Sequence, residues 1–248
     1  SSKTKKNNKP SAQLIKVKNP ELDLQETHEV NEFENLLHTI TTIHTEPIES
    51  INWAELSNAT PPYPEGSIGP NERQATEKLN NFKPSLLDKL FNRTEARKKI
   101  LEDEITEAKE FDKQLIANWL SETQLAKRII DGEVKALIDA IQEIHPYQTL
   151  LQLGSKMAAY TTAESDIINV EFNVNSNAVI PSDVKTLTKT GKVSIRKMGV
   201  TKYNELHLSY VTGGAIAIAK ESFAVLPIDS IYVHCIDTMV NPSTGVEE

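Results

Sequence analysis

The densest cluster of charged residues that could bind a ligand lies between residues 184 and 203. This basic segment holds six cations and no acid, inside a chain whose net charge is −8. A local positive field of this kind could meet phosphate groups, and such binding would weaken steeply with salt. The same pattern is typical of a solvated hairpin that pairs with acidic residues, here those between residues 21 and 55. The candidate anion-binding or nucleic-acid-binding residues are Lys185, Lys189, Lys192, Arg196, Lys197 and Lys202.

Carboxylates near the expected strands raise a second hypothesis, a metal-dependent nuclease. Metal-assisted hydrolysis needs clustered carboxylates to hold the cation, usually with a lysine nearby. The alternative is that these side chains are ordinary surface acids at the ends of strands. The nuclease hypothesis requires a set of four carboxylates to converge beside Lys192 or Arg196, namely Glu164, Asp166, Asp229 and Asp237.

Other catalytic and cofactor-binding patterns are missing from the sequence. The six histidines form neither His-Glu-x-x-His nor Glu-x-x-His, the spacings that place metal ligands on helices. Thr190-Gly191-Lys192 lacks both the earlier glycine and the following hydroxyl residue of a phosphate-binding loop. The single cysteine, Cys235, stands among β-forming aliphatic residues, where we expect a buried and inert thiol. The sequence therefore predicts no catalytic residue, no metal ligand and no cofactor.

Helices dominate the expected structure up to about residue 150. Only nine glycines occur in 248 residues, which favours long helices. Apolar spacing predicts helices from Pro20 to about residue 43, over residues 70–82, from residue 92 to about 130, and over residues 134–144. In the longest helix, a seam of Phe111, Leu115 and Trp119 could pack on its own neighbours or on a second copy. The short helix before it has an apolar face made by Leu86, Leu87, Leu90 and Phe91.

Strands appear after Gly154. Alternating apolar residues predict one strand over residues 166–174 and another over 228–239, with a hairpin turning at Gly191. A helix over residues 201–223 contains Gly213-Gly214, for which a close contact between this helix and the sheet is one explanation. The predicted fold class is α+β: a helical N-terminal region with a long helix, then a small mixed β-sheet packed on one central helix. We divide the chain into a flexible lysine-rich arm (1–19), a helical region (20–150) and an α+β domain (155–248).

The expected compartment is the cytoplasm. The first 18 residues carry six lysines but lack the apolar core of a signal peptide. No stretch reaches the roughly 20 apolar residues that a membrane helix needs. A lone cysteine cannot form an intrachain disulfide, as is usual for cytoplasmic proteins. We therefore expect no membrane partner.

Five segments of the chain carry a resemblance to known proteins: residues 61–72 (PPYPEGSIGPNE), 82–84 (FKP), 184–194 (VKTLTKTGKVS), 223–229 (FAVLPID) and 241–245 (NPSTG). They resemble a family of bacterial proteins of unknown function that carry a small glycine-rich β module at their N-terminus. The resemblance covers roughly residues 30–248, and the β module itself is absent here, as in a chain that begins in the linker after it. The resemblance implies no catalytic residues, and Gly213-Gly214 departs from the bulkier residues of the relatives.

Two functional hypotheses follow from these patterns. The favoured one is a non-enzymatic binding or assembly module, because a charge-segregated surface occurs without a catalytic constellation. Its partner would be another protein or a second copy of the chain. The alternative is a nucleic-acid-binding protein or a metal-dependent nuclease-like domain that uses the basic segment.

Overall fold

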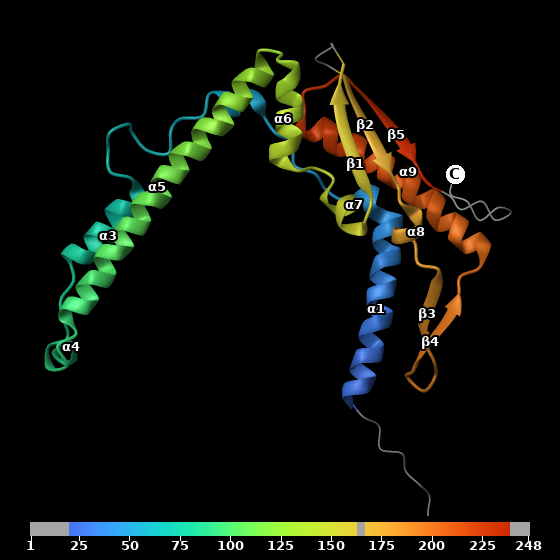
Figure 1. The fold of residues 1–248 in the computed structure, drawn as a ribbon, viewed down its shortest axis with the longest axis horizontal. Coiled ribbons are helices and arrows are strands. Elements are labelled where there is room, and N and C mark those ends of the chain that lie inside the picture. The colour runs from blue at the N-terminus through green and yellow to red at the C-terminus, as the bar shows by residue number, and fades with distance from the viewer. Residues whose placement is uncertain (1–19, 163–166, 239–248) are drawn as a thin grey trace, which may run out of the picture.

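A long helical element projects from an α+β body. A computed structural model describes residues 20–162 and 167–238. In Figure 1 the helix α5 (Thr94–Ile130) leaves the body beside α6 (Val134–Ile144) and runs to its far end at α4 (Leu86–Leu90). At 1.5 Å per residue, the 37 residues of α5 span about 55 Å. We call residues 58–120 the helical projection.

A three-stranded mixed sheet forms one layer of the body. Its order is β1-β2-β5, with β1 (Lys156–Thr161) antiparallel to β2 (Ile167–Asn173) and β5 (Ser230–Ile236) parallel to β2. The parallel pair needs a crossover, and the helix α9 (Val200–Val225) supplies it. This arrangement confirms the predicted α+β class, with a long helix and a small mixed sheet on a central helix.

The helices pack on one face of this sheet. Ile168, Val170 and Phe172 alternate along β2 and are fully buried beneath α9. Gly214 of α9 lies so close to the sheet that a Cβ there would come within 2.7 Å of the Phe172 ring. The predicted close contact between this helix and the sheet is therefore confirmed.

The core crosses the boundary expected near residue 150. It joins Ile40 of α1 (Pro20–Thr42) and Trp53 of α2 (Trp53–Ser57) to Leu150 of α7 (Gln148–Leu153) and to the sheet. The Trp53 indole nitrogen donates a hydrogen bond to the carbonyl of Val225, 2.9 Å away. The short 3-10 helix Ile43–Thr45 continues α1 against α9. The domain boundaries stay a prediction, while one cluster of buried residues extends across the expected boundary.

A second, two-stranded sheet lies against α1. The strands β3 (Asp183–Leu187) and β4 (Val193–Lys197) form an antiparallel hairpin that turns at Gly191, whose φ is 81°. The short helix α8 (Ser176–Val179) links β2 to this hairpin. Figure 1 shows the hairpin beside α1, at the end of α9 away from the sheet.

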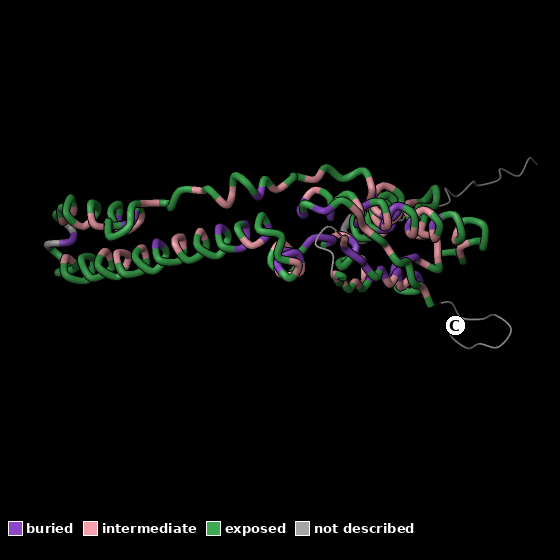
Figure 2. Tube along the Cα trace, turned by 90° about the horizontal axis from the view of Figure 1, so that it is seen from above, coloured by how far each residue is buried: buried purple, intermediate pink, exposed green. Residues whose placement is uncertain are grey.

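The helical projection is much more exposed than the body. The extended segment 58–69 and α3 (Pro70–Asn80) lie along α5. The projection therefore consists of the long helix α5 with an extended segment and a shorter helix beside it. Figure 2 shows most of the buried residues in the body and only scattered ones along the projection. Among the described helices, none combines the length and apolar character needed to cross a membrane.

Candidate functional site

The basic segment forms the β3–β4 hairpin and the first turn of α9, and half of its cations have acidic partners. One of these contacts reaches across to α1, in the acidic stretch of the sequence. Glu26, also on α1, accepts a hydrogen bond from the backbone N–H of Val193 at 3.1 Å. Pairing between the basic hairpin and the acidic stretch is thus present within one chain. The ion pairs are Lys185–Glu29 (3.4 Å), Lys197–Asp183 (3.1 Å) and Lys202–Glu205 (4.0 Å).

The other three cations of the segment are exposed. Lys189 and Lys192 lie in the turn of the hairpin, and Arg196 lies on β4. Within the described part of the chain, these three have no acidic partner. Among the described residues, the six cations therefore divide into three that have an acidic partner and three that are exposed on the hairpin without one.

The carboxylates of the nuclease hypothesis are not brought together where the structure describes them. Asp229 precedes β5 and Asp237 follows it, so about 25 Å of extended chain separates them. Glu164 and Asp166 lie outside the described residues. In the described part of the chain, no group of three or more His, Cys, Asp or Glu side chains is placed to hold a metal ion.

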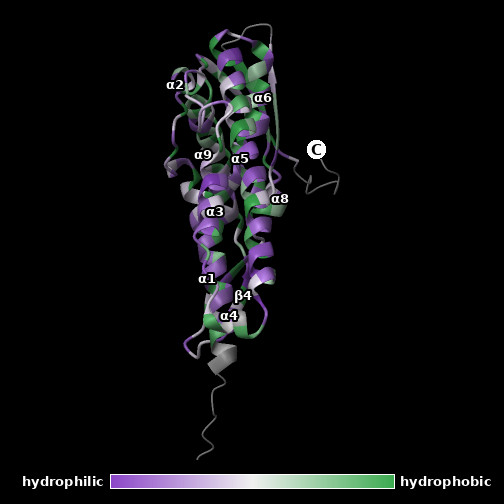
Figure 3. Cartoon of the chain, turned by 90° about the vertical axis from the view of Figure 1, so that its left-hand side faces the viewer, coloured by the Kyte–Doolittle hydropathy of each residue, from purple (hydrophilic) through white to green (hydrophobic). Residues whose placement is uncertain are grey.

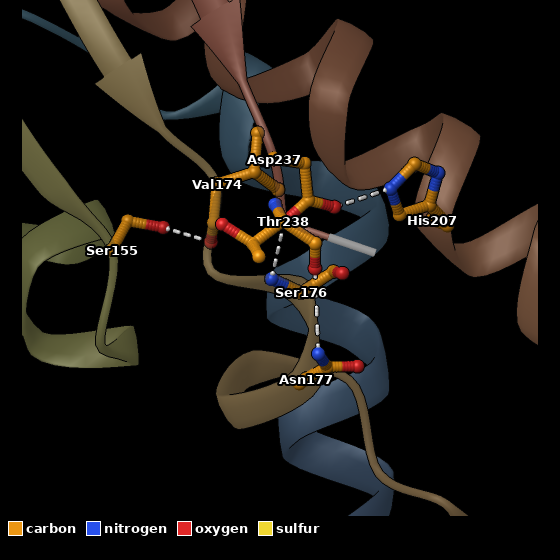
Figure 4. A network of polar contacts seen from close by, with 7 residues as sticks. All are labelled: Ser155, Val174, Ser176, Asn177, His207, Asp237 and Thr238. Carbon is orange, nitrogen blue, oxygen red and sulfur yellow. Dashed lines mark hydrogen bonds and ion pairs between the residues drawn. The ribbon is translucent and has the colours of Figure 1, made fainter. Parts of the chain in front are cut away.

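Asp237 instead takes part in a polar network at the carboxyl ends of the two parallel strands. Its Oδ2 lies 2.8 Å from Nε2 of His207 on α9, and its Oδ1 accepts a hydrogen bond from the backbone N–H of Ser176, 3.1 Å away. Figure 4 shows the carboxylate between His207 and the start of α8. Burial raises the pKa of Asp237, but the hydrogen bonds from Ser176 and His207 outweigh it and hold the pKa below its ordinary value.

This network joins elements and does not have the order of a catalytic triad. In a triad the histidine stands between the hydroxyl and the carboxylate and takes the proton of the hydroxyl. Here Asp237 stands between Ser176 and His207, and Ser176 is buried. The arrangement fixes the end of β5 to α8 and α9.

The single cysteine lies elsewhere than predicted. Cys235 is exposed on the edge strand β5, so the expectation of a buried thiol is wrong. The reason is that β5 borders the sheet, and strand-forming neighbours do not distinguish an edge strand from a central one. Partial burial of the sulfur still raises the pKa of Cys235, which favours the less reactive thiol form.

A buried carboxylate holds the helical projection together. Asp112 of α5 is only 2% exposed and accepts hydrogen bonds from the backbone N–H groups of Asn71 (3.2 Å) and Glu72 (2.8 Å). It also accepts one from Nδ2 of Asn71, at 2.7 Å. Asp112 therefore caps the N-terminus of α3 from a different helix. A side chain at Gly69 would overlap this carboxylate, so glycine leaves the space that it needs.

Two aromatic side chains fasten the extended segment to α5. The Trp119 indole donates to the carbonyl of Ala59 at 2.9 Å, and the Tyr63 hydroxyl donates to the carbonyl of Asp112 at 3.0 Å. Trp119 thus packs within its own chain, which was one of the two alternatives for the seam of Phe111, Leu115 and Trp119. Phe111, the first residue of that seam, is 59% exposed and lines a groove between α3 and α5.

The far end of the projection carries large exposed apolar side chains. Leu86 is 85% exposed, Leu90 75% and Phe91 60%. We call these three residues the apolar tip. Figure 3 shows hydrophobic residues at α4, beyond the mostly hydrophilic stretch of the projection.

The apolar tip is held in place by polar contacts beneath it. Asp88 is buried and accepts hydrogen bonds from the hydroxyl of Ser85 (2.6 Å) and from its backbone N–H (3.0 Å). Arg97 of α5 forms an ion pair with Asp88 at 2.9 Å. The Ser85 hydrogen bonds, helped by Arg97, lower the pKa of Asp88, so the carboxylate stays ionised and fixes α4 to α5.

Comparison with known proteins adds no further assignment. No family model, curated protein or solved structure matches the chain.

Proposed function

We propose that this chain is a non-enzymatic binding and assembly module that contacts a protein partner through its helical projection. The observation that carries the proposal is the apolar tip, where Leu86, Leu90 and Phe91 are mostly exposed at the end of α5. Large apolar side chains gathered at one place on a surface mark interaction sites.

The construction of the projection supports this role. The helical projection, which Asp112 and Trp119 hold together, carries the apolar tip far from the body. Asp88 fixes the tip to α5. A binding surface that is already ordered loses less conformational entropy when its partner arrives. The apolar tip is thus prepared for contact before binding.

A protein partner fits the chain better than a nucleic acid does. Aromatic and aliphatic side chains dominate the centres of protein interfaces, as they do at the tip. Half of the cations in the basic segment already have acidic partners. On the lone cysteine and the resemblance described above, we place the protein in the cytoplasm of a bacterial cell.

Site-specific photo-cross-linking of the full chain in its cell tests the proposal. A photoreactive residue at Leu90 should give a defined cross-linked product that mass spectrometry can identify. The matched control is Glu122, an exposed position on the same helix but near the body. A product from Glu122 alone, or from neither position, contradicts the proposal.

A further inference from the structure

One side of α5, together with the residue that precedes the helix, carries a regular row of mostly exposed residues. Glu104 is the exception, because it is half-buried and forms an ion pair with Lys78 of α3 at 3.7 Å. Ile100 (57% exposed) and Phe111 (59% exposed) are 11 residues apart, which is three turns and about 16 Å on the same side of the helix. The row follows the spacing of three and four residues that defines one helix face. We call it the outer face of α5: Arg93, Ala96, Ile100, Glu104, Glu107 and Phe111.

The charges on either side of Ile100 have opposite signs. Residues 97–104 read RKKILEDE, three cations before the apolar pair and three acids after it. The outer face repeats this order, with Arg93 before Ile100 and Glu107 after it. Ion pairs within the chain account for part of this order, since Arg97 pairs with Asp88 and Glu104 pairs with Lys78. The order is not one that the helix itself favours, because cations are unfavourable near a helix N-terminus. A lysine placed before a glutamate is also the weaker orientation of an i, i+4 pair.

We infer that the outer face of α5 binds the same face of a second copy, antiparallel, with Ile100 on the twofold axis. This inference rests on the proposed function and names its partner. In such a pair, a residue n positions before Ile100 stands opposite the residue n positions after it. Arg93 then meets Glu107 of the second copy, seven residues to either side, and Ala96 meets Glu104. A twofold axis makes each contact occur twice.

The charged residues at these positions are able to make the contact. Glu107 is exposed and, within the described residues, has no acidic or basic partner. The Arg93 guanidinium stacks over the Phe91 ring, 5.4 Å from its centre, at the edge of the tip. Opposite charges therefore face each other at both ends of the interface, whereas a parallel pair would place like charges together.

The same register covers the exposed apolar side chains. Phe111 lies eleven residues after Ile100, so it reaches the level of residue 89 of the second copy, within the apolar tip. A groove of about 390 Å³ between α3 and α5, lined in part by Ala75, Ala108 and Phe111, lies at this level of the helix. The tip of one copy would enter the groove of the other, and two helical projections would together form a four-helix arrangement.

Complementary charge reversal tests the inference on the full chain. In sedimentation equilibrium, Arg93→Glu and Glu107→Arg should each raise the dimer dissociation constant at least about tenfold, since two contacts per dimer turn from attractive to repulsive. An equimolar mixture of the two variants should dimerise again, because each interface contact is then a Glu–Arg pair. Glu122→Arg, outside the interface, should leave the dissociation constant unchanged.

Cysteine cross-linking gives an independent test of the register. In a Cys235→Ser background, Ile100→Cys should form an intermolecular disulfide on mild oxidation, because the residue meets itself on the axis. Asn118→Cys is the matched control on the same side of α5 and should remain a thiol.

Some outcomes overturn the inference while leaving the proposed function in place. One such outcome is a chain that stays a monomer at every concentration while Leu90 cross-links to a different protein. The partner is then not a second copy, but the proposed binding surface is correct. If the chain dimerises and neither charge reversal nor the mixture changes the dissociation constant, the inference is overturned. Failure of the proposed function is seen separately, as a Leu90 position that gives no cross-linked product.

Discussion

Replacing Asp112 by alanine should loosen the helical projection without unfolding the body. The carboxylate is buried and receives three hydrogen bonds from Asn71 and Glu72 at the start of α3. In the variant these donors lose their acceptor, and α3 loses the side chain that caps it. The core of the body lies elsewhere and contains no residue of α3.

The size of the effect follows from two contributions. Loss of a helix cap costs about 1 kcal/mol. A buried donor left without a partner costs about 1 kcal/mol or more. We therefore expect the opening free energy of α3 to fall by about 2 kcal/mol, which corresponds to a roughly 30-fold larger open population.

Acid should have a similar effect on the wild type. Burial raises the pKa of Asp112, but the hydrogen bonds from Glu72 and Asn71 outweigh it, so the folded pKa lies below its ordinary value. A lowered pKa means that the stabilisation is fully present above the unfolded pKa, about 3.9. The stabilisation is lost as the pH falls through the folded pKa. Asp112→Asn should remove this acid dependence.

Native-state hydrogen exchange measures the prediction directly. The α3 amides should exchange roughly 30-fold faster in Asp112→Ala, while amides of β2 and α9 keep their protection. The control is Glu122→Ala, which removes an exposed carboxylate from the same helix. It should change the opening free energy of α3 by less than about 0.5 kcal/mol. Equal α3 exchange in the two variants would refute the role of Asp112.

Three further predictions concern the body and the basic segment. Gly214→Ala should cost about 1–3 kcal/mol in urea unfolding because of the Phe172 ring, whereas Asn204→Ala, at an exposed position of the same helix, should not lower stability; equal midpoints would contradict the close contact. Trp53→Phe should lower stability in the same assay by about 1 kcal/mol through its lost hydrogen bond, and no change would show that the bond contributes nothing. Labelled duplex DNA should show no anisotropy increase with the chain at physiological ionic strength; binding that is lost on Lys192→Ala would reverse our preference for a protein partner.

The sequence predicted local structure well where the pattern is strong. The helix over residues 134–144 was expected at the bounds of α6, because its apolar residues repeat at three- and four-residue spacing. The strand β1 was missed, since its alternation rests on small residues such as Ala158 and Ala159. The longest helix was expected to begin at residue 92, but Asn92 has a left-handed φ of 53° and the helix begins after it, at Thr94.

Long-range contacts limited what the sequence could say of the candidate surfaces. The basic segment was recognised from composition, but the contact of Lys185 with Glu29 spans 156 residues and no local pattern encodes it. The apolar residues around Leu90 were recognised as a face of a short helix. Whether such a face is buried or exposed depends on what packs against it, and that is visible only in the fold.

The central claim is that the exposed side chains of the projection are covered in the working protein. Maleimide labelling of Leu90→Cys in a Cys235→Ser background, carried out in native cell extract, tests it most directly. We predict that Leu90→Cys reacts more slowly than Glu122→Cys in the extract, and that the two react equally fast after denaturation. A Leu90→Cys thiol that reacts as fast as Glu122→Cys in the native extract would contradict the account.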